Sequence, residues 1–71
     1  MINSNKLKGR MVEKGVSQHD AAQALGIAQP TFSQKCSGIR DFKLTEVQQL
    51  VSLLEISNDD VAEYFFAQQI T

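Results

Sequence analysis

The chain has 71 residues, of which 42% are hydrophobic, and its formal net charge at pH 7 is −1. A chain of this length holds one small hydrophobic core, so residues 1–71 are expected to form a single domain. The sequence contains neither the pattern of a signal peptide nor that of a membrane span, and we expect a cytoplasmic protein without membrane contacts. The single cysteine, Cys36, excludes an internal disulfide, and no Cys or His stands near it at the spacing of a metal site.

Hydrophobic periodicity along the chain predicts five helices and no strand, which is typical of the all-α class. The first helix is expected from about Ser4 to Lys14. Its buried residues are Leu7 and Met11, with Val12 as a further candidate for the core. Gly15 follows it and is suited to ending a helix.

Residues 17–38 carry the most informative pattern. Ser17 and Asp20 form a capping box at the start of a second helix, and Gly26 ends that helix. Pro30 suits the first turn of a third helix, expected over about residues 29–37. Phe32 and Cys36 lie one turn apart and form its buried stripe. Its outer face is therefore expected to hold Gln29, Thr31, Ser33, Gln34 and Lys35.

The loop after Gly38 contains two apolar residues, Ile39 and Phe42, which we expect to anchor the loop in the core. Thr45 and Gln48 then form a second capping-box pattern near the start of a helix over residues 44–54. The apolar residues of this helix recur at helical spacing and form its expected core face, which consists of Val47, Leu50, Val51 and Leu54.

Ser57 and Asp60 form a third capping-box pattern and predict a fifth helix over residues 57–66. Phe66 lies outside the buried stripe of this helix and, with Ile70, suggests an apolar patch. Such a patch is consistent with a homodimer, with docking of another protein, or with Phe66 folding under the domain to close its core. The expected stripe itself is Val61, Tyr64 and Phe65.

Charge is distributed unevenly between the two parts of the chain. Residues 1–40 contain six cations and two acids, whereas residues 41–71 contain one cation and six acids. This asymmetry predicts a basic end that faces phosphate and an acidic end that faces solvent, a second subunit or a basic protein. The alternative is that these residues are ordinary solvated helix faces.

Six residues, which lie between the start of the second helix and the loop after the third, have a spacing that resembles that of the Cro/C1-type (XRE-like) helix-turn-helix regulators of phages and bacteria. These residues are Gln18, Ala22, Gly26, Gln29, Phe32 and Gly38. The resemblance covers about residues 7–65 and implies a compact, five-helix, lambda-repressor-like domain whose recognition helix spans about residues 29–37. The C-terminal run EYFF is also similar to very short prophage Cro-like proteins of Gram-positive bacteria.

The resemblance implies a set of contacts with double-stranded operator DNA. Gln18 would touch a phosphate and brace Gln29, and Gln29 would pair with adenine in the major groove. Pro30 disfavours helical geometry at Gln29, so the alternative is that Gln29 caps its helix instead of reading a base. The remaining implied contacts with bases or backbone come from Arg10, Thr31, Ser33, Gln34, Lys35, Ser37, Arg40 and Lys43.

The sequence offers little support for an enzyme, because it contains no catalytic triad, no phosphate-binding glycine loop and only one histidine. We expect no cofactor, metal or small-molecule substrate. The second hypothesis is a modulator or antirepressor that keeps the helix-turn-helix scaffold but binds a partner repressor protein. A homodimer or partner interface is then expected at the C-terminal part of the chain, with Asp59, Asp60, Glu63, Tyr64, Phe66 and Ile70.

Overall fold

The computed structural model describes residues 2–66, and all of its regular secondary structure in that range is helical. The prediction of an all-α protein is therefore confirmed. The five helices are α1 (Ser4–Glu13), α2 (Gln18–Leu25), α3 (Gln29–Cys36), α4 (Leu44–Leu53) and α5 (Val61–Phe65). None of these helices is long and apolar enough to cross a membrane, a statement that covers the described residues only.

Local hydrogen bonds explain where α2 begins and ends. The Ser17 hydroxyl accepts a bond of 3.0 Å from the Asp20 amide, and the Asp20 carboxylate accepts one of 3.3 Å from the Ser17 amide. At the other end Gly26 adopts φ = 71°, a left-handed conformation that costs glycine little. The predicted capping box and glycine stop are both confirmed.

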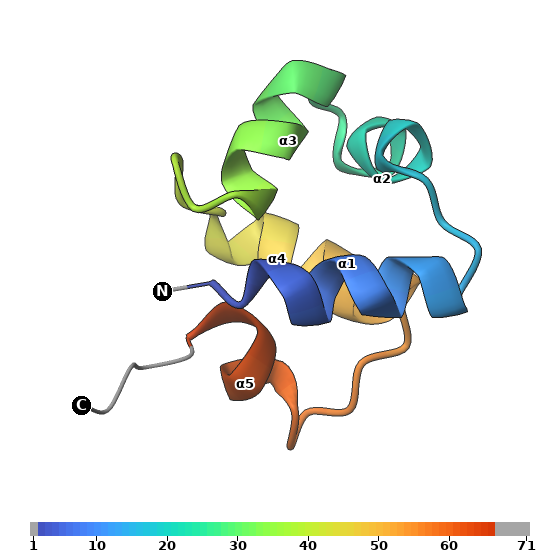
Figure 1. Cartoon of the computed structure of the whole chain (residues 1–71), viewed down its shortest axis with the longest axis vertical. Coiled ribbons are helices and arrows are strands. Elements are labelled where there is room, and N and C mark those ends of the chain that lie inside the picture. Colours follow the sequence, from blue (N-terminus) through green and yellow to red (C-terminus); the bar gives the residue numbers. More distant parts are fainter. Residues whose placement is uncertain (1, 67–71) are drawn as a thin grey trace.

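The helices form three levels (Figure 1). The α2 and α3 helices lie at one end of the molecule, α1 and α4 cross its middle, and α5 lies at the opposite end. Contacts join α2 to α3 and α4, and they join α1 to α3 and α5. The short connection of residues 26–28 therefore joins two helices that contact each other. Each of them also packs on another part of the core, α2 on α4 and α3 on α1.

Aromatic rings link the ends of the core. Phe32 on α3 is fully buried, and its ring lies 5.9 Å from that of Phe42 in an edge-to-face arrangement. Phe42 in turn lies 5.8 Å from Phe65 on α5. Phe42 thus anchors the loop between α3 and α4, as predicted. The other fully buried large side chains are Leu7, Cys36, Leu50 and Leu54.

Two apolar residues that were expected in the core or as anchors lie at the surface. Val12 is 80% exposed, because Leu7 and Met11 already fill the buried side of α1. Ile39 is 75% exposed, because Phe42 alone carries the loop into the core. The predictions for both residues are wrong.

The predicted capping boxes of the last two helices need correction. The α4 helix starts at Leu44, as predicted, but its N-cap is Lys43, whose amide donates to Glu46 Oε1 at 2.8 Å. The Thr45–Gln48 pattern therefore does not cap it. Ser57 accepts only a 3.3 Å bond from the Asp59 amide, within a turn. The α5 helix starts at Val61 and is shorter than predicted.

Candidate nucleic-acid interface

The α3 helix buries one side and presents hydrogen-bonding groups on the other. Phe32 and Cys36 are completely buried, as the helical spacing predicts. Gln29 is exposed at the first position of the helix, and Thr31, Ser33 and Gln34 are partly exposed. This face combines amide and hydroxyl side chains without a charge, and its position at one end of the molecule leaves it open to a partner.

The α3 helix begins without a side-chain cap. Its N-cap residue is Ala28. Gln29 is therefore a helical residue, and the alternative that Gln29 itself caps the helix is wrong. Pro30 lies in the first turn, where its missing N–H breaks no helical bond. The first-turn amide N–H groups of a helix without a side-chain cap favour an anion such as phosphate.

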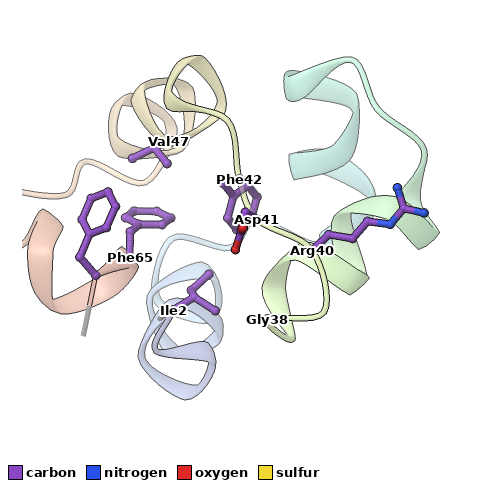
Figure 2. Close-up of a pocket in the computed structure, with 8 residues that line it drawn as sticks. Ile2, Gly38, Arg40, Asp41, Phe42, Val47 and Phe65 are labelled. Carbon is purple, nitrogen blue, oxygen red and sulfur yellow. The ribbon is translucent and has the colours of Figure 1, made fainter. Parts of the chain in front are cut away.

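Other predicted contacts lie beside this face. Gln18 is partly exposed at the first position of α2, directly after the capping Ser17. Ser37, Arg40 and Lys43 are exposed on the segment that follows α3. Figure 2 shows the Arg40 side chain pointing away from Phe42 and Phe65, so its guanidinium is free of the core.

Lys35 does not lie on the outer face, which corrects the prediction for this residue. It is 7% exposed, and its Nζ donates to Glu46 Oε1 at 2.6 Å and to Oε2 at 2.8 Å. Burial opposes ionisation of Glu46, but the bonds from Lys35 and from the Lys43 amide outweigh it and lower the pKa of Glu46. Lys35 therefore has a partner inside the protein and is not placed to touch a phosphate.

Arg10 is also occupied within the protein. Its Nε donates to the Leu54 carbonyl at 2.9 Å, and its Nη2 donates to the Glu55 carbonyl at 2.8 Å. These carbonyls lie at the C-terminal end of α4, where helical C=O groups lack partners. The predicted phosphate contact of Arg10 is replaced by this cap of α4.

Ion pairs formed on folding offset part of the uneven charge of the sequence. Lys6 on α1 pairs with Glu63 on α5 at 2.5 Å, and Lys14 pairs with Glu55 at the end of α4. With Arg10 and Lys35, four of the seven cations have acidic or carbonyl partners. Within residues 2–66 the cations without an ion pair are Lys8, Arg40 and Lys43.

The C-terminal residues expected at a partner interface separate into two groups. Tyr64 is 8% exposed, the Lys6 ammonium lies 5.0 Å from its ring centre, and its carbonyl accepts from the Asn3 amide. It belongs to the α1–α5 contact, which corrects its assignment to an interface. Asp59, Asp60 and Glu63 are exposed, and Ile70 lies outside the described residues.

Phe66 is 58% exposed, so it does not fold under the domain to close the core. It lines a hollow of about 390 Å³ together with Phe42 and Phe65. Figure 2 shows Phe42 and Phe65 meeting in this hollow, with Ile2 and Val47 on its sides. The exposed Phe66 and this hollow form a small apolar surface.

Cys36 is a core residue, as predicted. Burial raises the pKa of its thiol to about 11, so the nucleophilic thiolate is scarce at neutral pH. The Ser4 hydroxyl donates to the Cys36 carbonyl and ties the end of α3 to the start of α1. Cys36 thus contributes to the packing that holds α3.

Glu46 is the residue of this region that the sequence analysis did not identify. Its signal was present, because a glutamate three residues after a helix N-cap commonly accepts from the cap amide. Lys43 and Glu46 have this spacing. The bond of Glu46 with Lys35 depends on how the fold brings the start of α4 to the end of α3, and it has no local signal in the sequence.

The fold and this surface define a small all-α domain with an uncharged, hydrogen-bonding helix face at one end. The sequence model described as "Protein of unknown function (DUF739)" matches residues 2–68, which is nearly the whole chain. The protein therefore belongs to the DUF739 family. No curated protein matches the chain.

Proposed function

We propose that the protein is a Cro/C1-like transcriptional regulator of a phage or prophage, which binds operator DNA in the cytoplasm through a helix-turn-helix formed by α2 and α3. The observation that carries this proposal is the outer face of α3. This face carries Gln29, Thr31, Ser33 and Gln34, on the side of the helix away from the buried residues, and it lies at one end of the molecule. Amide and hydroxyl side chains are the groups that read base edges in the major groove.

The phosphate contacts in this proposal come from a small set of groups. Gln18 at the start of α2 and Ser37, Arg40 and Lys43 after α3 flank the base-reading face. Lys35 and Arg10 take no part, because both donate to partners inside the protein. Two copies whose recognition helices lie roughly 34 Å apart would read a palindromic operator.

The test is a titration of the protein against the intergenic DNA beside its own gene at several salt concentrations. Each phosphate that a Lys or Arg neutralises contributes about −0.9 to the slope of log affinity against log salt, so Arg40 and Lys43 predict a shallow slope of about −2 per chain. Gln34→Ala should weaken specific binding about tenfold, as expected for one lost base contact. The matched control, Gln48→Ala on α4, should bind as the wild type does. Absence of sequence-specific binding would exclude the proposal.

The second candidate function is binding to a repressor protein as a modulator or antirepressor. The observation that favours it is the small number of free cations, together with the exposed apolar side chains of Ile39, Leu44 and Phe66. In the same titration this function predicts no shift by the protein alone and an altered shift when the neighbouring repressor is added. Phe66→Ala should then reduce the effect, whereas Gln34→Ala should reduce direct DNA binding.

A further inference from the structure

The Lys35–Glu46 pair joins two helices through a single carboxylate. Lys35 Nζ donates to both oxygens of Glu46, at 2.6 and 2.8 Å, and Oε1 also accepts from the Lys43 amide at 2.8 Å. Lys35 lies in the last turn of α3, whereas Lys43 and Glu46 form the start of α4. The carboxylate therefore fixes the end of one helix against the beginning of the next.

Stability alone does not explain a pair at this position. Removing two charges from water costs free energy that their attraction recovers only in part, and well-packed apolar residues often stabilise a protein equally well. Both residues are nearly inaccessible to solvent, with exposures of 7% for Lys35 and 5% for Glu46. What an apolar pair lacks is direction, because three hydrogen bonds to one carboxylate allow few relative positions of the two helices.

The segment between the two helices carries residues of the proposed DNA interface. Residues 37–43 include Ser37, Arg40 and Lys43, and the segment leaves α3 with the Ile39 amide donating to the Gln34 carbonyl at 2.9 Å. Phe42 holds its far part in the core. A change in the angle between α3 and α4 would therefore move the base-reading face relative to Arg40 and Lys43.

We propose that Lys35 and Glu46 are positioning residues for DNA recognition. Their pair holds the outer face of α3 and the segment 37–43 in one fixed arrangement, so that base contacts and phosphate contacts form together. Lys35 acts from the inner side of the recognition helix and touches no DNA. This inference rests on the proposed function, but its structural part can be tested without DNA.

The test removes the charges while keeping the volume. In the double variant Lys35→Met with Glu46→Gln, the glutamine oxygen still accepts from the Lys43 amide and no unpaired charge is left in the core. We expect a thermal midpoint within a few degrees of the wild type. Affinity for the operator should fall about tenfold or more, as for a lost base contact, while affinity for unrelated DNA changes less than about threefold.

The matched control is Lys6→Met with Glu63→Gln, which removes an exposed pair of the same residue types between α1 and α5. Its operator affinity should stay within about twofold of the wild type, because exposed pairs contribute little. Amide hydrogen exchange gives the readout that needs no DNA. The amides of Ile39, Arg40 and Lys43, which donate hydrogen bonds in the structure, should exchange at least about tenfold faster in the Lys35–Glu46 double variant, and those of α2 should not change.

Unchanged exchange at Ile39, Arg40 and Lys43 in a folded double variant would overturn the proposal, and so would unchanged operator affinity. If the wild type binds no operator, the proposed function fails, and the exchange experiment still decides whether the pair positions the segment. If the double variant does not fold, Lys35→Met with Glu46→Met, which leaves neither a charge nor an unpaired polar side-chain group in the core, is measured in the same way. The same two outcomes then support or overturn the proposal.

Discussion

At the scale of single residues, Phe32 has the largest effect on stability that the structure predicts. Its ring is fully buried and contacts Phe42, so Phe32→Ala leaves a cavity and should destabilise the domain by about 3–5 kcal/mol. The matched control is Phe66→Ala, because Phe66 is 58% exposed, and we expect a loss below about 1 kcal/mol. Urea unfolding at pH 7 measures both. Equal losses would contradict the described core.

Glu55 has an unfavourable backbone conformation for a residue with a side chain. Its φ is 52°, directly after the end of α4, where helices often place a glycine. Glu55→Gly and Glu55→Ala both remove the ion pair with Lys14, but only glycine relieves the strain. The glycine variant should therefore melt roughly 4–8 °C above the alanine variant in a thermal scan. A lower midpoint for glycine would show that the left-handed conformation is absent.

At the scale of helices, two serines that look alike in the sequence have different roles. Ser17 caps α2 through a reciprocal pair of bonds, whereas Ser57 lies in a turn four residues before α5. Ser17→Ala should cost about 1 kcal/mol, the usual effect of a lost N-cap. Ser57→Ala should cost less than about 0.5 kcal/mol, as for an ordinary surface change. Chemical denaturation of the two variants side by side checks the difference, and a larger loss at Ser57 would contradict the observed start of α5.

The same comparison shows which parts of the fold are predictable from local sequence. The limits of α2 follow from Ser17, Asp20 and Gly26 because capping and left-handed glycine act within a few residues. The start of α5 does not follow from Ser57 and Asp60. That helix has five residues, and distant parts of the chain hold it: α1, through Lys6–Glu63 and the bond from the Asn3 amide to the Tyr64 carbonyl, and Phe42, which contacts Phe65.

The candidate interface was predictable to a similar extent. Helical spacing places Phe32 and Cys36 inside and leaves Gln29, Ser33 and Gln34 toward solvent, as the structure shows for these positions. The burial of Lys35 was not predictable, because a lysine usually extends to solvent and its partner lies eleven residues further along the chain. Only the fold, which returns the start of α4 to the last turn of α3, brings the two charges together.

At the scale of the whole molecule, folding brings cations from the first half of the chain against acids from the second. The pairs are Lys6–Glu63, Lys14–Glu55 and Lys35–Glu46, and they connect α1 to α5, α1 to the end of α4 and α3 to the start of α4. The charge asymmetry of the sequence therefore serves partly to hold the fold. It leaves a less basic surface than the first 40 residues suggest, which is why we expect a shallow dependence of DNA binding on salt.

These pairs make the stability of the protein dependent on acid pH. The Lys14 and Lys6 ammonium groups lower the pKa of Glu55 and Glu63, and bonds from Lys35 and Lys43 lower that of Glu46 against the effect of burial. A carboxyl whose pKa is lowered by folding stabilises the protein fully above its unfolded pKa of 4.5. That stabilisation is lost as the pH falls through the folded values.

The urea midpoint should therefore be nearly constant from about pH 7 to pH 5 and should decrease as the pH falls below about 4.5. The triple variant Glu46→Gln, Glu55→Gln and Glu63→Gln should start from a lower midpoint at pH 7 and decrease less on acidification, because three groups that take up protons are gone. Salt screens exposed charges more than buried ones. At pH 7, about 1 M NaCl should therefore weaken the exposed Lys6–Glu63 and Lys14–Glu55 pairs more than the buried Lys35–Glu46 pair. A midpoint that stays constant down to pH 3 would mean that the three ion pairs do not form in solution.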